Sequence, residues 1–323
     1  MVSPDLPSEL EQLTDSETRV DELRLATFAV AIASMQVIRR FQMNGGIIAL
    51  PDKADGSVLT AVDMESAESA TVVLHQYAPG VPILDEELGL SSEFLQNSDF
   101  LFLNDPIDGT RPFKAEAPTP TAISSLYDLR GKKLQAATIA EPASGRLWHT
   151  DGRRTWQARV DEAGFMIDNT MRRCRVWDGQ YDKNGMVLID NFREFHRPDP
   201  KSETGRLILS GANVRNLFSN LNDKIHIQNY GSNGLHHALV ANGGDGVAGA
   251  ITTSMGGEWD VAGVLAVTAA GGVAEGFHVT EERTLKSVDP LNPFDYDMVI
   301  SANNSRTLDF LRQSLVESVH GQD

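Results

Sequence analysis

Cysteine is almost absent from this chain of 323 residues, since Cys174 is the only one. A single thiol excludes an intrachain disulfide and zinc sites built from two or four cysteines. Arginines at positions 172, 173 and 175 flank Cys174, and their charges would lower the pKa of its thiol if they lie close in space. With no partner base in evidence, we expect a thiol without a catalytic role, in a protein of the reducing cytoplasm.

Positive charge is also scarce, because Lys and Arg number 28 against 45 Asp and Glu, which gives a net charge of −17. Such a surface repels polyanions, which argues against nucleic-acid polymers and anionic membranes as partners. The acidity still allows a small phosphorylated substrate, because a bound divalent cation can reverse the charge of a site locally.

Neither a signal peptide nor a membrane span is expected. Residues 1–13 carry acids and prolines in place of a basic region followed by an apolar stretch. The most apolar stretch, residues 261–277, is rich in Gly and Ala and falls short of the ~20 residues that a membrane helix needs. We therefore expect a soluble cytoplasmic protein with no membrane partner.

Two helices are predicted near the N-terminus. Apolar residues at helical spacing predict a long amphipathic helix over 18–41. A second helix is predicted over 61–77, because Thr60 and Asp63 have the spacing of an N-terminal cap and Pro79-Gly80 stops the helix.

Strands follow these helices. The short apolar runs 81–84 and 100–103 predict buried strands with acidic residues at their carboxyl ends, where α/β proteins usually place their sites. Segments 121–127 and 134–139 predict the two arms of a hairpin. The first half of the chain therefore has an α+β pattern.

The second half has an α/β pattern that is harder to follow. Residues 142–200 are the least legible, with 186–189 the clearest strand. Apolar segments then alternate with Gly- and Asn-rich turns, at 206–210, 224–227 and 235–241. A helix over 259–270 is predicted to end at Gly271-Gly272.

The length exceeds the usual size of a single hydrophobic core, which favours two domains or one large layered unit. We expect an α/β fold with an α+β domain over 1–205, which carries most of the candidate ligands, and an α/β domain over 206–323.

Acidic residues gather at the boundaries of these elements. Each stands at a helix start or directly after a strand: Asp63, Asp85-Glu86-Glu87, Asp105 with Asp108, and Asp260. Oxygen ligands without a cysteine or histidine set suit hard cations such as Mg²⁺ or Mn²⁺. Hydrolysis of a phosphate ester is the natural use of such a cluster, because paired ions can generate hydroxide and stabilise the leaving oxygen.

Seven of the eight histidines are interpreted as structural. They show no metal-ligand spacing apart from one adjacent pair, whose side chains point apart on a regular element. These residues are His75, His149, His196, His226, His236, His237 and His278.

The run Asp105-Pro106-Ile107-Asp108-Gly109-Thr110 is central to the acidic pattern. Pro106 and Gly109 force a tight turn, so that two carboxylates, a backbone carbonyl and a hydroxyl can converge on one ion. Gly109 also lets backbone N–H groups approach a phosphate oxygen. For any single run of this kind, an Asx-type turn that only caps a strand is the alternative.

Four motifs follow one another along the chain: Lys53 to Asp63, Asp85-Glu86-Glu87, Asp105 to Thr110, and Trp259-Asp260-Val261-Ala262. In these motifs and in their order the chain resembles the inositol monophosphatase superfamily of Mg²⁺-dependent, lithium-inhibited phosphatases. The resemblance covers most of the chain. It implies a layered αβαβα sandwich, two or three Mg²⁺ ions or Mn²⁺ in their place, and a homodimer.

The resemblance also assigns roles. The metal ligands would be Glu86, Asp105, the Ile107 carbonyl, Asp108, Thr110 and Asp260. Asp63 and Thr110 would orient the attacking water and accept its proton, beside an ion held by Glu86. The phosphoryl group and the rest of the substrate would meet Gly109, Thr110, Arg111, Gly231 and Ser232.

Some positions depart from the family pattern. Asp85 stands where the family often has Gly. Its carboxylate could hold a metal ligand in place or be solvated, and we expect it to be solvated. Arg111 after the threonine is associated with the histidinol-phosphate branch, although a surface arginine paired with an acid is an equal alternative. The segment 245–259 is longer than in inositol phosphatases, so the family's glutamate for inositol hydroxyls is not placed.

The resemblance makes inositol monophosphate the leading expected substrate, ahead of histidinol phosphate and 3′-phosphoadenosine 5′-phosphate. A metal- or phosphate-binding regulatory protein that has lost turnover is the rival outside enzymes. Six oxygen-bearing side chains of the family pattern are all present, and this complete set argues against the rival. They are Asp63, Glu86, Asp105, Asp108, Thr110 and Asp260.

Overall fold

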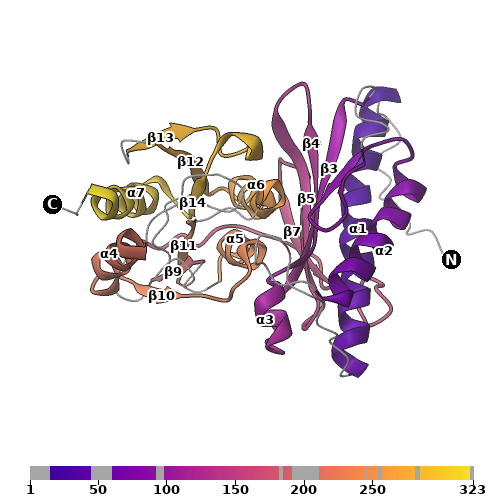
Figure 1. Cartoon of the computed structure of the whole chain (residues 1–323), viewed down its shortest axis with the longest axis horizontal. Coiled ribbons are helices and arrows are strands. Elements are labelled where there is room, and N and C mark those ends of the chain that lie inside the picture. Colours follow the sequence, from indigo (N-terminus) through magenta and orange to yellow (C-terminus); the bar gives the residue numbers. More distant parts are fainter. Residues whose placement is uncertain are drawn as a thin grey trace.

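The structure is a computed structural model that describes residues 15–44, 60–91, 98–181, 185–190, 211–244, 246–253, 257–280 and 284–320. These residues form five layers, which follow one another in Figure 1 as helices, sheet, helices, sheet and helices. The expected α/β fold and its αβαβα arrangement are therefore confirmed.

Helices α1 (Asp15–Asn44) and α2 (Ala61–Tyr77) form the first layer and cover the outer face of the first sheet (Figure 1). Both predicted helices are confirmed. The Thr60 hydroxyl accepts from two N–H groups of the first turn of α2, and Asp63 completes a capping box by accepting from the Thr60 N–H. Leu74 of α2 packs with buried side chains of α1 and of the sheet in one core cluster.

Among the described residues, the first sheet has eight strands in the order β2-β1-β3-β4-β5-β6-β7-β8, and within it only β1 and β3 run parallel. Its strands are β1 (Ile83–Asp85), β2 (Gly89–Leu90), β3 (Phe100–Asp108), β4 (Thr121–Asp128), β5 (Lys133–Glu141), β6 (Arg146–Thr150), β7 (Thr155–Arg159) and β8 (Arg172–Arg173). The two predicted buried strands are β1 and β3, and the predicted hairpin is β4–β5. The short helix α3 (Thr110–Lys114) follows β3 directly.

In the part of the chain that the structure describes, the second sheet has six strands in the order β10-β9-β11-β14-β12-β13. Its strands are β9 (Met186–Ile189), β10 (His226–Gln228), β11 (Val247–Thr252), β12 (Val273–Val279), β13 (Leu285–Val288) and β14 (Met298–Ala302). The predicted strand over 186–189 is confirmed as β9, which pairs in parallel with β10 and β11. β9 belongs to the second sheet although it precedes residue 205, and the division into domains at residue 205 stays a prediction. The apolar segment 206–210 lies outside the described residues.

Helices α5 (Asn233–Asn242) and α6 (Ala262–Ala269) fill the space between the sheets, while α4 (Gly211–Asn222) and α7 (Ser305–His320) cover the outer face of the second sheet (Figure 1). The apolar segment 235–241 is thus a helix. The predicted helix over 259–270 is confirmed as a 3₁₀ turn, η4 (Glu258–Val261), that continues into α6. A short 3₁₀ turn, η5 (Pro293–Asp295), precedes β14.

The small residues of the middle layer explain its tight packing. A Cβ on Gly263 of α6 would collide with Cβ of His237 in α5, so this glycine lets the two helices approach closely. Six consecutive residues of α6 are buried, since α6 meets neighbours on all sides. Within the described parts of the chain, no helix combines the length and the apolar character needed to cross a membrane.

Candidate metal centre

Three carboxylates from distant parts of the chain meet at the carboxyl end of β3. Ligand oxygens of Asp105, Asp108 and Asp260 all lie within 4.8 Å of one another. The three residues are only 3%, 5% and 4% exposed. Asp105 and Asp108 end β3, whereas Asp260 belongs to η4 at the start of the middle-layer helix α6. Packing of the first sheet against the middle layer therefore assembles the cluster.

The turn after β3 fixes Asp105. Its Oδ1 accepts from the Ile107 N–H at 3.0 Å. Burial raises the pKa of Asp105 well above its ordinary value, and the nearby carboxylates of Glu86, Asp108 and Asp260 raise it further. Glu86 also hydrogen-bonds to Asp105. Four acidic side chains of the predicted ligand set are thus gathered in one place.

Asp108 accepts four hydrogen bonds. Oδ2 accepts from the hydroxyls of Thr121 and Ser232 at 3.0 and 2.6 Å and from the Gly234 N–H at 2.7 Å, while Oδ1 accepts from the Asn233 N–H at 3.1 Å. Burial raises the pKa of Asp108, and these donors oppose the rise because they favour the ionised form. The carboxylate is therefore anchored to β4 and to the start of α5.

Thr110 and Asp63 are in contact. The Thr110 hydroxyl oxygen lies 3.1 Å from Oδ1 of Asp63 and 3.1 Å from the Ile107 carbonyl oxygen. Asp63 is fully buried, and its other oxygen, Oδ2, accepts from the N–H and the hydroxyl of Thr60 at 2.7 and 2.6 Å. The helix cap of α2 thus aims the remaining carboxylate oxygen at Thr110.

Two glycine turns lie against each other beside the carboxylates. Gly109 has φ +96°, in the left-handed region, and a Cβ there would lie 2.8 Å from the Gly231 carbonyl oxygen. Gly231 has φ +74° and donates its N–H to Oδ1 of Asn229 at 2.6 Å. The Ser232 hydroxyl is buried and directed at Asp108. The residues predicted to bind the phosphoryl group are therefore neighbours.

Arg111 is the second residue of the short helix α3 and directly follows Thr110. It is exposed on α3. Residues 53–59 of the first motif lie outside the described residues, so only its last four residues are described.

One expectation is wrong. Asp85 was expected to be solvated, yet it is 1% exposed and accepts from the Glu87 N–H at 2.8 Å and from Nδ2 of Asn104 at 2.5 Å. It organises the turn that carries Glu86. Burial raises the pKa of the Cys174 thiol to about 11. The charge of Arg172 lowers this pKa, as expected of a nearby arginine, but burial outweighs it.

The buried histidines make structural contacts. His237 lies between the hydroxyls of Ser301 and Thr252, at 2.7 and 3.0 Å, and Nε2 of His236 accepts from the Tyr230 N–H at 2.9 Å. Burial lowers their pKa values to about 4 and about 3. Both rings are therefore neutral near pH 7, and the structural interpretation is confirmed for this pair.

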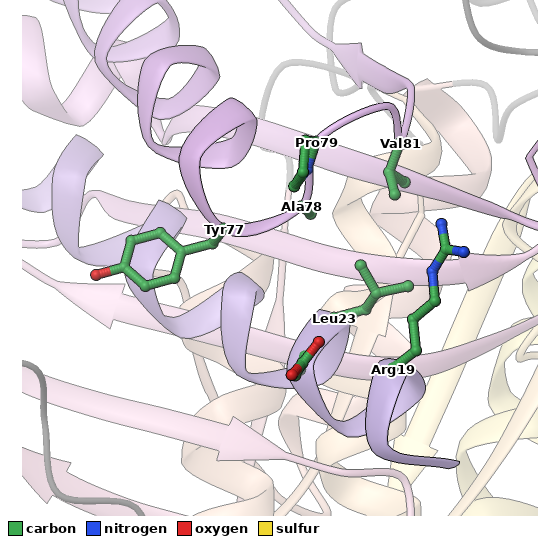
Figure 2. Close-up of a pocket in the computed structure, with 7 residues that line it drawn as sticks. Arg19, Leu23, Tyr77, Ala78, Pro79 and Val81 are labelled. Carbon is green, nitrogen blue, oxygen red and sulfur yellow. The ribbon is translucent and has the colours of Figure 1, made fainter. Parts of the chain in front are cut away.

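A cavity of about 350 Å³ lies apart from these residues, between the first turns of α1 and the end of α2 (Figure 2). Its lining consists of Arg19, Glu22, Leu23, Tyr77, Ala78, Pro79 and Val81. None of these is a predicted site residue.

The donor set of the cluster fits a hard divalent cation. Three buried carboxylates whose oxygens lie within 4.8 Å of one another repel one another, and burying such charges is costly unless they are compensated. Burial, and then the charges of the neighbouring carboxylates, raise the pKa of Asp105. A cation among these oxygens would remove the repulsion, and an all-oxygen set favours ions such as Mg²⁺ or Mn²⁺ over zinc or copper. The cluster can therefore hold a metal.

The sequence pattern of the inositol monophosphatase family matches residues 19–318. The chain belongs to the inositol monophosphatase family. This family is metal-dependent and acts on small phosphorylated substrates, in agreement with the buried carboxylates described above.

Two curated proteins are similar to parts of this chain. The chloroplastic bifunctional phosphatase IMPL2 of Arabidopsis thaliana is 33% identical over 157 residues, which are 48% of this chain and 42% of the relative. A glucose-1-phosphate thymidylyltransferase of Streptomyces griseus is 32% identical over 141 residues, which are 43% of this chain and 49% of the relative. The chain thus spans less than half of the length of these relatives.

The crystal structure of the extragenic suppressor protein SuhB from Bartonella henselae has a TM-score of 0.68, with 90% of this chain and 97% of that chain covered. At 20% identity this likeness shows the fold alone.

Sequence reasoning missed the residues that hold the acidic ligands in place. Thr121 and Gly234 contact Asp108, and Asn104 contacts Asp85. Nothing in the local sequence marks Thr121 or Asn104, because their partners are distant in the chain. Gly234 could have been noticed because it follows Ser232, which caps α5, by two residues.

Proposed function

We propose that this protein is a Mg²⁺-dependent phosphomonoesterase that hydrolyses a small phosphorylated metabolite, with inositol monophosphate as the leading substrate. The observation that carries the proposal is the buried trio of Asp105, Asp108 and Asp260 next to the Asp63–Thr110 contact. Carboxylates to hold ions and a carboxylate–hydroxyl pair to handle a proton are the two parts that metal-assisted hydrolysis needs.

The acidic residues would bind the metal. Glu86, Asp105, Asp108 and Asp260 are the side-chain ligands in this proposal, together with the Ile107 carbonyl and Thr110. When bound, Mg²⁺ supplies Lewis-acid stabilisation of phosphoryl charge and lowers the pKa of water. The number of ions in turnover, two or three, is part of the proposal.

Asp63 would accept the proton of the attacking water through Thr110. Its Oδ2 accepts from Thr60, and Oδ1 is the oxygen that faces Thr110. The Thr110 hydroxyl lies equally far from Asp63 and from the Ile107 carbonyl, so its single proton can be directed to either. Thr110 can then accept from water while it donates to Asp63.

The adjoining glycine turns would bind the phosphoryl oxygens. Gly109 and Thr110 offer backbone N–H groups, and the left-handed conformation of Gly109 exposes the backbone at this point. Gly231 and Ser232 contribute the facing turn. Because the Gly231 N–H already donates to Asn229, it would have to exchange that bond on binding.

Histidinol phosphate is the alternative substrate. Arg111 follows Thr110 on α3 and is exposed, so its guanidinium would meet the part of a substrate beyond the phosphate. The curated relative IMPL2 is named a bifunctional phosphatase, which favours testing more than one monoester. A 3′(2′),5′-bisphosphate nucleotidase activity is the third candidate. A homodimer and a cytoplasmic location complete the proposal.

A phosphate-release screen tests the substrate. Inositol 1-phosphate, histidinol phosphate, fructose 1,6-bisphosphate and 3′-phosphoadenosine 5′-phosphate would be compared by kcat/KM in the presence of Mg²⁺. We expect inositol 1-phosphate to give the highest value. A higher value for histidinol phosphate that falls in Arg111→Gln, with Lys114→Gln as the control, would favour the alternative. No release from any monoester would favour a binding protein without turnover.

A further inference from the structure

Donors from two layers of the fold hold Asp108. Thr121 begins β4 in the first sheet, whereas Ser232, Asn233 and Gly234 form the start of α5 in the middle layer. The hydroxyls of Thr121 and Ser232 are almost completely buried, at 0% and 1% residue exposure. Solvent therefore cannot replace either donor easily, and the orientation of the Asp108 carboxylate depends on them.

The two oxygens of Asp108 are unequally occupied. Oδ2 accepts three hydrogen bonds, although a carboxylate oxygen has about two lone-pair sites. Oδ1 accepts one, from the Asn233 N–H. The Thr121 and Ser232 hydroxyl oxygens lie 3.1 Å apart, so one hydroxyl can donate its hydrogen bond to the other. Oδ2 of Asp108 then still accepts from the remaining hydroxyl and from the Gly234 N–H. The oxygen with room for a further partner is Oδ1.

We infer that Thr121 and Ser232 are positioning residues that turn Oδ1 of Asp108 toward the metal ion, an inference that rests on the proposed metal site. Neither hydroxyl is a ligand in this account. Residues that orient a metal ligand typically change metal affinity or activity by about 10–100-fold when they are removed. Thr121 thereby becomes part of the metal site without touching the ion.

The close approach of α5 supports this role. A Cβ on Gly234 would lie 2.9 Å from Oδ2 of Asp108 and 2.6 Å from Cδ1 of Ile123. Any side chain at this position would push the helix start away from the carboxylate. The glycine keeps two N–H groups and the Ser232 hydroxyl within reach of one aspartate.

Thr121→Val tests the inference because it removes the hydroxyl and keeps the shape of the side chain. Thr121→Ser restores a hydroxyl, and Thr155→Val is the matched control. Thr155 is also a buried threonine of the first sheet, and its hydroxyl donates to the Ala266 carbonyl at 2.7 Å. Mg²⁺ would be titrated into the substrate-free, previously chelated full-length protein by calorimetry, and melting temperatures would be recorded with and without the ion.

We expect Thr121→Val to weaken Mg²⁺ binding about 10-fold, at the lower end of the usual range, because the other three donors remain. Thr121→Ser should recover most of the affinity, and Thr155→Val should bind Mg²⁺ like the unaltered protein. In turnover, Thr121→Val should need more Mg²⁺ for half-maximal rate, with kcat largely restored at saturating Mg²⁺.

Unchanged Mg²⁺ affinity in Thr121→Val would overturn the inference, as would an equal loss in Thr155→Val, which would indicate a general effect of stability. Failure of the unaltered protein to bind Mg²⁺ is a different outcome. It would contradict the proposed metal site itself, and the inference would fall with it.

Discussion

The Thr110 hydroxyl oxygen lies 3.1 Å from Oδ1 of Asp63, a residue 47 positions earlier in the chain. Asp63 uses one carboxylate oxygen for each of two tasks. Oδ2 completes the capping box of α2 with Thr60, and Oδ1 contacts Thr110 at the start of α3. A local helix-capping motif therefore fixes a side chain of the proposed proton-transfer pair.

Asp63→Asn should lower kcat about 10²–10⁴-fold, because an amide cannot accept the proton that general-base assistance requires. The amide keeps an oxygen that can accept from the Thr60 N–H in the capping box, so the free energy of unfolding should fall by only about 1 kcal/mol. Rates at saturating Mg²⁺ and substrate, together with a melting curve, measure both effects. Glu68→Gln, an exposed change on the same helix, is the control and should leave kcat unchanged. Normal turnover in Asp63→Asn would remove Asp63 from the mechanism.

Asp105→Asn should stabilise the metal-free protein. Burial and neighbouring carboxylates raise the pKa of Asp105, so its ionised form is unfavourable when no cation is bound. In chelator we expect a melting temperature about 2 °C higher, equivalent to roughly 1 kcal/mol in a chain of this size. Added Mg²⁺ should raise the melting temperature of the unaltered protein more than that of the variant.

Asp168→Asn is the control for this charge removal, because Asp168 is exposed. It should leave both the chelated melting temperature and the Mg²⁺ response unchanged. If Asp105→Asn instead lowers stability in chelator, repulsion among the carboxylates is weaker than the favourable contacts that the Asp105 carboxylate makes.

Gly109→Ala should lose activity and about 1–3 kcal/mol of stability. The new Cβ must accommodate φ +96° and a backbone oxygen of Gly231 at 2.8 Å, which would separate the two glycine turns. Gly80→Ala is the matched control, since Gly80 has φ +78° but no atom of the described chain lies within 4 Å of its Cβ position. Chemical denaturation of both variants separates the cost of backbone conformation from that of the contact. Equal stability and activity in the two variants would contradict the role of the turn contact.

His237 should make the protein less stable as the pH falls. The folded ring has a pKa of about 4, lowered by burial from the ordinary 6.5, so only the unfolded chain binds a proton between these values. The neutral His237 ring contributes fully to the free energy of unfolding above pH 6.5. This contribution is lost toward pH 4, by about 1 kcal/mol per pH unit. The destabilisation caused by His237→Asn should therefore shrink from pH 7 to pH 5 in denaturant titrations. The exposed His226→Asn should show no such trend, and parallel pH profiles for His237→Asn and the unaltered protein would contradict the assignment.

The sequence predicted those elements whose signals are local. Helix α2 has the predicted bounds because Thr60, Asp63 and Pro79-Gly80 act within a few residues. The β4–β5 hairpin is equally local. Strands β6 to β8 are short and are held by pairing with neighbours, so residues 142–173 carry only a weak pattern of their own. The assignment of β9 to the second sheet depends on non-local pairing and could not be foreseen.

In the candidate site, too, the residues with local signals could be predicted from the sequence, whereas their distant contacts could not. The acidic residues could be chosen because each lies at an element boundary, and the structure brings Asp105, Asp108 and Asp260 together. Asp85 was expected to be solvated because sequence does not reveal Asn104 as its partner. For Cys174, adjacency to arginines says nothing about burial, which decides the pKa of the thiol.

Phosphate release with Mg²⁺ present and then chelated, in the unaltered protein and in Asp260→Asn, tests the central claim most directly. Asp260 closes the carboxylate trio from the middle layer. The account predicts release from the preferred monoester that stops on chelation, returns when Mg²⁺ is restored, and falls at least ~100-fold in Asp260→Asn. Release that survives chelation, or that is undiminished in Asp260→Asn, would contradict a metal-dependent reaction at this cluster.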